Sequence, residues 1–322
     1  MHAIVIEDGQ PSWQPVPELI SPAAGEVVIK VAWAGVNRAD LMQRAGHYPP
    51  PQGASDILGL EVSGVIVEIG EGVEHLNQGD KVCALLEGGG YAEKVKVDAR
   101  QVLPLPVGFD LRQGAALMEA FATAWLNVFM LGLLSEGERV LIHAGASGVG
   151  TAAIQLCSAL QHPCFVTVGS DEKLAFCREL GADAGHNRHQ GSFVDAVKAW
   201  GGADLILDPV GAGYLPDNQR VLNMDGRLVL IGLMEGRKAE LDMGRLLMKR
   251  QRLIGSTLRS KSPEAKGDIL AELALHVWPR LENGEIKPLI DSEYAITDVE
   301  AAHQHMTQNA SSGKLLLKIG AL

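Results

Sequence analysis

The sequence predicts an α/β protein in which an antiparallel, barrel-like β region precedes a parallel sheet covered by helices on both faces. The first third of the chain consists of short β-rich segments separated by glycine and proline. From about Gly114 onward, apolar strand-like segments alternate with helical segments, as is typical of parallel sheets. A glycine-rich turn at residues 145–150 joins one of these strands to a helix. With 322 residues, of which 47% are hydrophobic and 21% charged, the chain is long enough for two domains.

The individual elements follow from local composition. Glycine and proline delimit the strands of the first third, and the prolines at 49–51 mark a loop. We expect strands at the N-terminus and at residues 27–33, 61–69, 81–84 and 91–97. The alternating region predicts, in order, a helix at 115–133, strands at 139–143 and 164–168, helices at 172–180 and 193–200, and strands at 203–208, 226–232 and 253–258.

The C-terminal segment contains too few elements for a third domain, so we expect it to complete the N-terminal one. The predicted domains are therefore residues 1–122 together with 257–322, and residues 123–256. The C-terminal elements are a helix at 263–282, a strand at 291–296, a helix at 299–306 and a closing strand at 314–319.

The composition excludes several classes of function. A net charge of −11 argues against nucleic-acid binding, and the basic cluster at residues 249–252 is typical of a solvated helix end. No apolar run is as long as a membrane helix requires, about 20 residues, and the N-terminus lacks the pattern of a signal peptide. The four cysteines form no C-x-x-C pair, and the histidines at 186, 189, 303 and 305 lack further ligands at metal-binding spacing. We therefore expect a soluble cytoplasmic protein with free thiols and no metal, nucleic-acid or membrane partner.

The glycine-rich turn between a strand and the following helix predicts a dinucleotide site. It fits the pattern G-x-G-x-x-A from Gly148 to Ala153, or the longer G-x-G-x-x-G pattern from Gly145 to Gly150 with Ser147 in the place of the second glycine. Such a turn exposes backbone N–H groups at the positive end of a helix, where a pyrophosphate binds. The P-loop sequence Gly-Lys-Ser/Thr is missing, so a dinucleotide is favoured over ATP.

The end of the next strand, residues 166–173, determines the choice of dinucleotide. Asp171 could hold the ribose 2′-hydroxyl of NAD, whereas Gly169, Ser170 and Lys173 suit the 2′-phosphate of NADP. The alternative is that Ser170 only caps the helix and that Lys173 is solvated. Taken alone, this stretch favours NADP modestly.

A set of short segments along the chain carries a family resemblance. Two of them hold the polar residues Asn37, Asp40 and Tyr48, whose types alone favour helix caps and turns. The segments are Gly35-Val-Asn37-Arg-Ala-Asp40, Gly46-His-Tyr48-Pro, Leu58-Gly-Leu-Glu61-Val-Ser-Gly-Val-Ile, Gly79-Asp-Lys-Val, His143-Ala-Gly-Ala-Ser-Gly-Val-Gly150, Glu179-Leu-Gly-Ala-Asp183 and Gly226-Arg-Leu-Val. In this order they resemble the medium-chain dehydrogenase/reductase superfamily over essentially the whole chain, and within it the zeta-crystallin-like quinone oxidoreductases. The resemblance implies a GroES-like β-barrel catalytic domain interrupted by a doubly wound parallel, or Rossmann, sheet domain.

The resemblance also implies an enzyme without zinc. Zinc alcohol dehydrogenases of the superfamily have cysteine where this chain has Asn37 and histidine where it has Leu60, before the retained Glu61. The cysteines of their structural zinc site are missing as well. Because catalytic zinc needs three good ligands, a zinc-dependent alcohol dehydrogenase is rejected.

The resemblance implies NADPH as the cofactor, since the zinc-free relatives use it. Ser170 and Lys173 would then face the 2′-phosphate, and Asp171 would lie in the first turn of the helix. Relatives commonly have tyrosine where this chain has Arg188, which could pair with the phosphate, stack on adenine or face solvent. The other expected cofactor-binding residues are Thr123, Gly145, Ser147, Gly148, Val149, Gly150, Gly232 and Lys314.

The function implied by the resemblance is reduction of a quinone, or of a similar conjugated carbonyl, by hydride from NADPH. Negative charge develops on the carbonyl oxygen, so a hydrogen-bond donor is needed there. Tyr48 and Asn37 are the best candidates and Arg259 is a third, while solvent could supply the proton. The alternatives are an enoyl or alkenal reductase and a largely non-catalytic NADPH-binding protein. Relatives pair through an edge strand of the Rossmann sheet, so the resemblance also implies a homodimer.

Overall fold

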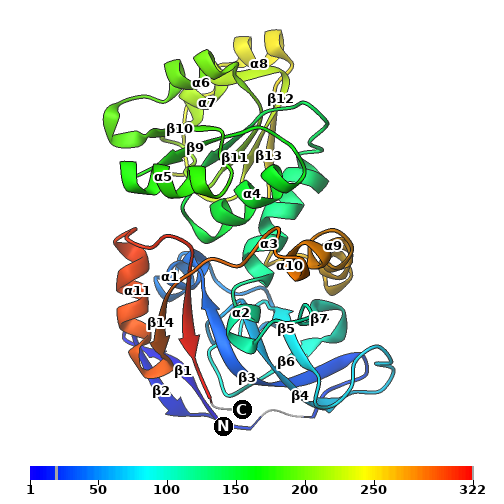
Figure 1. Ribbon diagram of the computed structural model, residues 1–322. Helices are drawn as coiled ribbons and strands as arrows, with labels where there is room; N and C mark the ends of the chain where they lie inside the picture. Colours follow the sequence, from blue (N-terminus) through cyan, green and yellow to red (C-terminus); the bar gives the residue numbers. More distant parts are fainter. Residues whose placement is uncertain (19–20, 321–322) are drawn as a thin grey trace. The chain divides into compact units, whose positions relative to one another are not determined.

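The chain forms two compact units in the computed structural model, which describes residues 1–18 and 21–320 (Figure 1). One unit comprises Met1–Ala122 and Leu258–Leu322, and the other comprises Thr123–Thr257. The second unit is therefore an insertion in the sequence of the first.

The first unit is a mostly antiparallel β structure. Its strands are β1 (His2–Glu7), β2 (Gln10–Pro15), β3 (Glu26–Val36), β4 (Glu61–Ile69), β5 (Lys81–Leu85), β6 (Lys94–Asp98), β7 (Val102–Pro104), β14 (Ile290–Ala295) and β15 (Lys314–Lys318). Its helices are α1 (Arg38–Arg44), α2 (Leu111–Gly114), α3 (Met118–Trp125, which continues into the second unit), α9 (Pro263–His276), α10 (Trp278–Glu282) and α11 (Val299–Thr307).

Seven of these strands form one sheet in the order β14-β15-β3-β4-β5-β7, with β6 pairing to β3, while β1 and β2 form a separate hairpin. The last strand, β15, pairs antiparallel with β3, so the C-terminal segment lies in the same sheet as the N-terminal strands. Only β14 and β15 are parallel, because the connection between them contains α11 rather than a tight turn. On β3, Val27, Ile29 and Val31 are almost completely buried and form part of the core.

The second unit is an all-parallel sheet with helices between the strands. Its strands are β8 (Val140–His143), β9 (Cys164–Val168), β10 (Ala184–Asn187), β11 (Ala203–Asp208), β12 (Leu222–Leu230) and β13 (Arg252–Gly255), and its helices are α4 (Gly148–Ala159), α5 (Asp171–Glu179), α6 (Val194–Trp200), α7 (Leu215–Val221) and α8 (Met243–Lys249). The strand order β10-β9-β8-β11-β12-β13 reverses between β8 and β11, as in doubly wound dinucleotide-binding sheets. The predicted doubly wound parallel sheet is therefore confirmed.

Several elements differ from the sequence prediction. The helix expected at 115–133 is divided into α3 and a π-helical segment, Leu126–Leu131, because the side chain of Asn127 donates to Thr123 O at 2.7 Å and Gly132 N donates to Asn127 O at 3.1 Å. The helix expected at 263–282 ends at His276, and Pro279 lies in the first turn of the next helix. The helices and strands missed by the prediction are α1, α2, α7, α8, β2, β7 and β10, all of them seven residues or shorter.

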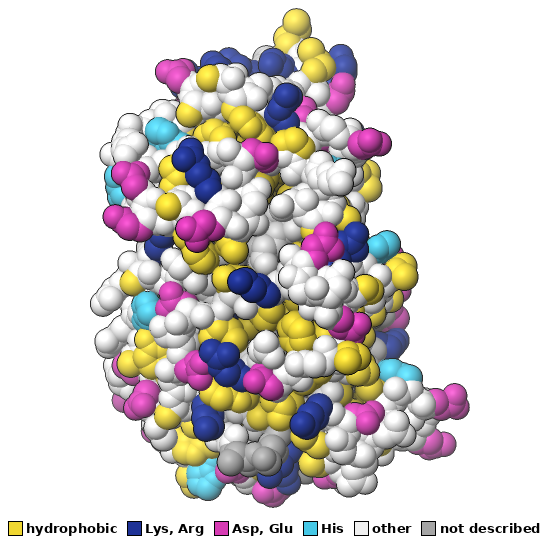
Figure 2. All heavy atoms as spheres, in the orientation of Figure 1, with side chains coloured by type: hydrophobic (Ala, Val, Ile, Leu, Met, Phe, Trp, Pro, Cys, Tyr) yellow, Lys and Arg dark blue, Asp and Glu magenta, His cyan; other side chains and the backbone are white. Residues whose placement is uncertain are grey.

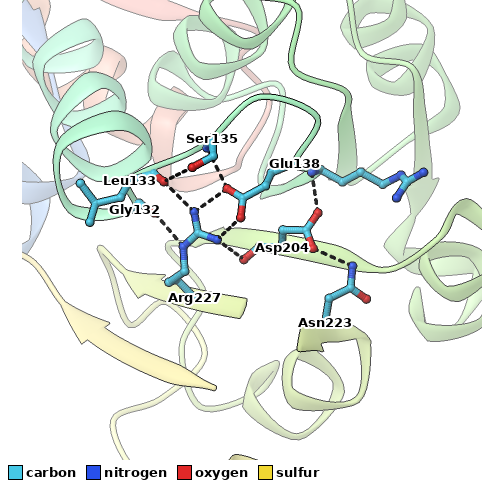
Figure 3. Close-up of polar contacts among 8 residues, drawn as sticks. Gly132, Leu133, Ser135, Glu138, Asp204, Asn223 and Arg227 are labelled. Carbon is cyan, nitrogen blue, oxygen red and sulfur yellow. Dashed lines mark hydrogen bonds and ion pairs between the residues drawn. The ribbon is translucent and has the colours of Figure 1, made fainter. Parts of the chain in front are cut away.

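One buried arginine joins the π-helical segment to the sheet of the second unit (Figure 3). Arg227, on β12, makes a bidentate ion pair with Glu138, with both N–O distances at 2.7 Å. Its Nε donates to Gly132 O at 2.7 Å and its Nη2 to Leu133 O at 3.0 Å. These carbonyls end the helical segment and have no further helical donors, so the guanidinium caps the helix while it neutralises Glu138.

In the described residues, no helix is long and apolar enough to cross a membrane. The four cysteines are free and buried.

Candidate functional site

The glycine-rich turn at the carboxyl end of β8 is shaped by close backbone contacts. Ala144 has a left-handed conformation, with φ of 54°. A Cβ atom on Gly150 would lie 2.5 Å from the carbonyl oxygens of Ala144 and Gly145, and one on Gly145 would lie 2.8 Å from Val166 Cβ. Only glycine fits at positions 145 and 150, which is why the turn can pass tightly from strand to helix.

The turn leaves backbone donors free at the start of α4. Ser147 caps the helix, since its Oγ accepts from Gly150 N at 3.0 Å. The N–H groups of Gly148 and Val149, in the first turn, have no intrahelical acceptor, and the helix dipole favours negative charge beside them. The arrangement fits the pyrophosphate of a dinucleotide.

The buried polar side chains next to this turn are hydrogen-bonded to one another. His143, at the end of β8, bonds to Thr167 Oγ1 at 2.8 Å and to Asn218 Oδ1 at 2.7 Å. Asn218 donates in turn to Asp208, whose other oxygen accepts from Val210 N at 2.6 Å. Burial lowers the pKa of His143, so the imidazole is neutral and adds no positive charge to the phosphate site.

Gly232 lies at the carboxyl end of the neighbouring strand pair. A Cβ there would lie 2.7 Å from Pro209 O, so no larger residue fits without movement of the chain. The residue therefore keeps the backbones that follow β11 and β12 close together at the edge where ligands bind in doubly wound sheets.

The tip of β9 carries the groups expected to select the cofactor. Ser170 caps α5, and its Oγ accepts from Lys173 N at 3.2 Å. The guanidinium of Arg188 lies beside Gly169, since a Cβ on that glycine would be 3.7 Å from Arg188 Nε. The carboxylate of Asp171 accepts from Asn187 Nδ2 at 2.9 Å and from the side chain of Gln190 at 3.1 Å. The carboxylate of Asp171 is thus hydrogen-bonded to side chains of the second unit, while the guanidinium of Arg188 lies at the end of β9.

In the first unit, Asn37 belongs to a buried charged network. Its Nδ2 donates to Glu61 Oε1 at 3.0 Å, and its Oδ1 accepts from Lys314 Nζ at 2.7 Å. The Lys314 ammonium also lies 2.5 Å from Glu61 Oε1 and donates to Val36 O at 3.0 Å. Glu61 Oε2 accepts from Glu119 N at 3.0 Å, so both carboxylate oxygens have partners. All three protons of Lys314 are used inside the unit, and its expected contact with the cofactor stays a prediction.

Asp40 orders the loop beside this network. Its carboxyl group is fully buried and accepts from Asn37 N at 2.8 Å, Gly59 N at 3.1 Å and the Tyr91 hydroxyl at 2.9 Å. Burial raises the pKa of Asp40 to about 6, although these hydrogen bonds oppose the rise. The side chain holds the start of α1 in place and is turned away from solvent.

Tyr48 is held by Arg259. The guanidinium lies 5.3 Å from the centre of the Tyr48 ring and donates to Tyr48 O at 3.2 Å. It also donates to Glu87 O at 2.7 Å and to Gln43 Oε1 at 2.6 Å. The phenol is half-buried, and its hydroxyl has no hydrogen-bond partner within the described part of the chain. Tyr48 therefore offers a free donor on a loop that Arg259 fixes.

The structure brings the expected site residues together in two groups. In the second unit they lie at the carboxyl edge of the parallel sheet, except Thr123, which is half-buried on α3. In the first unit Asn37 and Lys314 share one network, and Tyr48 and Arg259 form a contact pair. The prediction missed the pairing of Glu61 with Lys314 and the presence of Glu119 beside them. A lone carboxylate in the apolar stretch 115–126 was the available signal for Glu119.

The two positions at which zinc alcohol dehydrogenases of the superfamily have zinc ligands carry non-ligating contacts in this structure. Leu60 is 1% exposed and packs in the interior, and Asn37 is bonded to Lys314 and Glu61. Within residues 1–18 and 21–320, no group of three histidine, cysteine or carboxylate side chains could hold a metal ion.

Comparison with known proteins identifies the family. The alcohol dehydrogenase GroES-like domain model matches residues 23–107 and the zinc-binding dehydrogenase model matches residues 148–274. The synaptic vesicle membrane protein VAT-1 homolog of Rattus norvegicus is 31% identical over 320 residues, covering 93% of this chain and 78% of that protein. The quinone oxidoreductase of Rattus norvegicus is 30% identical over 302 residues, covering 92% of this chain and 90% of that protein.

Among solved structures, the quinone oxidoreductase of Thermus thermophilus, which is also known in complex with NADPH, has a TM-score of 0.84 at 30% identity. The match covers 99% of this chain and 100% of that one. The chain therefore belongs to the medium-chain dehydrogenase/reductase family of oxidoreductases, and the expected combination of a GroES-like domain with a Rossmann sheet is confirmed.

We predict that Lys314→Met lowers the free energy of unfolding by about 3–5 kcal/mol, because it leaves the Glu61 carboxylate buried without a cation. The matched control is Lys318→Met, an exposed residue on the same strand, which should cost less than about 1 kcal/mol. Chemical denaturation followed by circular dichroism measures both. The double variant with Glu61→Gln should cost clearly less than the sum of the two single changes. Additive effects would show that the two groups do not act as a pair.

Proposed function

We propose that the protein reduces quinones by hydride transfer from NADPH, without a metal. The observation that carries the proposal is the closed network of Asn37, Glu61 and Lys314, in which Asn37 stands where zinc alcohol dehydrogenases of the superfamily have a cysteine. Its ammonium and amide groups bond to each other and to the carboxylate, which leaves no ligand set for a Lewis acid. The similarity to two quinone oxidoreductases over nearly their full length supports the choice of acceptor.

NADPH is the proposed cofactor. When bound, it would supply the hydride and both electrons. The N–H groups of Gly148 and Val149 would hold its pyrophosphate, and Ser170, Lys173 and Arg188 its 2′-phosphate. The carboxylate of Asp171, already bonded to two amide side chains, is not free to hold a ribose 2′-hydroxyl as in NAD sites.

The first unit would supply the groups that act on the acceptor. The hydroxyl of Tyr48 would donate to the carbonyl oxygen on which negative charge develops. Arg259 would hold the phenol in place through its contact with the ring and with Tyr48 O. We assign Asn37 a positioning role, because its amide and carbonyl are bonded to Glu61 and Lys314.

A homodimer is the proposed assembly. β13 is an edge strand of the parallel sheet and leaves one row of backbone groups unpaired. The adjacent helix α8 exposes Met243, Leu247 and Met248, at 73%, 76% and 74% of their surface. Figure 2 shows hydrophobic side chains projecting at the top of the molecule, where Figure 1 places α8. A second copy would present the same strand and the same apolar helix, and so would cover both features.

A reducing, cytoplasmic setting is proposed as well. It is supported by the four free cysteines, all buried.

The purified protein should oxidise NADPH with 1,2-naphthoquinone in the presence of a metal chelator. Tyr48→Phe should lower kcat/KM by about a hundredfold, because it removes the donor to the carbonyl oxygen. Tyr294→Phe is the matched control, since that hydroxyl bonds to His305. Absence of NADPH oxidation, or activity that is restored only by added zinc, would contradict the proposal. Faster reaction with 2-alkenals would assign an alkenal reductase, and tight NADPH binding without turnover a non-catalytic role.

Lys173→Glu should raise the KM for NADPH by about tenfold or more and change the KM for NADH much less, because only NADPH carries the 2′-phosphate. Steady-state kinetics with both cofactors measure the difference. Lys198→Glu, on α6, is the control for a general change of charge in this unit. Equal effects on the two cofactors would mean that Lys173 does not contact the phosphate.

Leu247→Glu combined with Met248→Glu should convert the dimer to monomers, because two buried carboxylates would face their symmetry copies. Analytical ultracentrifugation measures the mass in solution. Leu275→Glu, an exposed leucine on α9 at 65% exposure, should leave the mass unchanged. A wild-type protein that sediments as a monomer would contradict the proposed assembly.

A further inference from the structure

Four buried side chains form one hydrogen-bonded chain at the carboxyl edge of the parallel sheet. The hydroxyl of Thr167 lies 2.8 Å from His143 Nδ1, and His143 Nε2 lies 2.7 Å from Asn218 Oδ1. Asn218 Nδ2 donates to Asp208 Oδ2 at 2.9 Å. None of the four residues is more than 2% exposed. We call these four residues the His143 chain.

The direction of every hydrogen bond in the His143 chain follows from its Asp208 end. The other oxygen of Asp208 accepts two backbone N–H groups of the loop that follows. Because a carboxylate only accepts, the amide nitrogen of Asn218 faces it and the amide oxygen faces His143. The ring of His143 therefore carries its proton on Nε2, and its Nδ1 accepts from the Thr167 hydroxyl. Burial lowers the pKa of His143, which agrees with a neutral ring.

The His143 chain crosses the point at which the strand order of the sheet reverses. His143 is the last residue of β8, Thr167 is the last but one of β9, and Asp208 is the last of β11. These strands are neighbours in the order β9-β8-β11, and Asn218 joins them from α7. Dinucleotides bind outside the carboxyl ends of the strands at such a reversal. The chain thus connects the strand ends that lie on both sides of the expected cofactor site.

Two of these strands continue directly into segments expected to bind the cofactor. His143 precedes Ala144, whose left-handed conformation starts the glycine-rich turn. Thr167 lies two residues before Gly169, at the end of β9 where the 2′-phosphate is expected. The bond between His143 and Thr167 therefore fixes the turn relative to the end of β9.

The third strand continues into a loop that Asp208 shapes. Asp208 Oδ1 accepts from Val210 N at 2.6 Å and from Gly211 N at 3.1 Å. Val210 O accepts in turn from Glu235 N at 2.8 Å, so the loop after β11 is tied to the segment after β12 that contains Gly232. The carboxylate therefore holds a further part of the cofactor edge.

The His143 chain has no atom left with which its imidazole could bond to a ligand. Both ring nitrogens of His143 are used within the chain. The rings of Phe193 and Tyr214 lie 4.9 and 4.7 Å from the imidazole and fix its plane. Because the four side chains are buried, loss of one bond leaves the neighbouring group without a partner. The chain is therefore suited to hold its surroundings in place and not to transfer protons to a substrate.

We propose that the His143 chain is a positioning device for the cofactor, which holds the glycine-rich turn, the end of β9 and the loop after β11 in one fixed arrangement. The inference rests on the proposed function, since it assigns these segments to NADPH. With the chain intact, the segments are ordered before the dinucleotide binds. Without it, their ordering becomes a cost of binding. The four residues are thus positioning residues, and the chemical step does not depend on them.

Thr167→Val is the first test, because it replaces the hydroxyl with a methyl group of similar size and removes the donor to His143. The Kd for NADPH, measured by isothermal titration calorimetry, should rise by about tenfold. The value of kcat at saturating NADPH should stay within about twofold of the wild-type value, since the chain acts on binding. Thr167→Ser keeps the hydroxyl and should restore the Kd to within about twofold of the wild-type value.

Asn218→Leu breaks the link between His143 and Asp208 and should raise the Kd for NADPH at least as much. Asn223→Leu is the matched control, because Asn223 Nδ2 donates to Asp204 Oδ1 at 2.9 Å, the same type of bond at the amino end of the sheet (Figure 3). Both changes should lower the melting temperature, whereas only Asn218→Leu should weaken NADPH binding. Loss of stability in Asn218→Leu with an unchanged Kd would show a structural role alone and overturn the inference.

A third measurement needs neither cofactor nor turnover. In protein labelled with ¹⁵N at the histidine rings, the signals of His143 at neutral pH should show a proton on Nε2 and none on Nδ1. They are assigned by their change in Thr167→Val. A proton on Nδ1 would contradict the direction of the chain and overturn the inference.

The binding data separate this inference from the proposed function. Binding of NADPH by the wild type, with the same Kd in Thr167→Val and Asn218→Leu, would overturn the inference and leave the proposed function standing. Absence of NADPH binding by the wild type would overturn both.

Discussion

The buried ion pair between Lys314 and Glu61 is the interaction on which the site of the first unit depends. Its members come from β15 and β4, which lie on either side of β3 in the sheet. Removing two charges from water is costly, and the cost is offset only when every remaining proton and lone pair has a partner. Asn37, Val36 O and the N–H of Glu119 provide those partners. One pair thus fixes the start of α1, the start of α3 and the last strand of the chain.

This pair also explains why two neighbouring carboxyl groups differ. The ammonium of Lys314 lies against Glu61, whereas burial, and after it the charge of the nearby Glu61, raises the pKa of Glu119. The remaining cations do not compensate, since Lys266 is paired with Glu87. An acid that keeps its proton at neutral pH therefore needs no unusual side chain here. It results first from burial, and then from the unequal sharing of a few cations among more numerous carboxylates.

The sequence could predict what depends on neighbours along the chain. The turn at residues 145–150 could be predicted because its glycines, its capping residue and the preceding strand are contiguous in the sequence. The parallel sheet could be predicted from the alternation of strands and helices. The pairing of Glu61 with Lys314 could not be predicted, because it joins residues that are far apart in the sequence of the first unit. Glu119 carries no local sign of its pKa, which depends on that pairing. β10 was missed because four residues containing Gly185 give no periodic pattern.

At the tip of β9, the structure bears on the two interpretations of Ser170 that the sequence left open. Ser170 does cap α5, as the structural interpretation required, because its oxygen accepts from Lys173 N. The same side chain also hydrogen-bonds the Glu172 carboxylate, whose pKa this bond lowers, so the hydroxyl proton already has an acceptor within α5. Gly169 allows the guanidinium of Arg188 to approach the strand tip, and Asp171 is held by amide side chains. The sequence could suggest the cap, because it joins residues three apart, but it could not place Arg188 beside Gly169, since that contact joins the ends of two neighbouring strands.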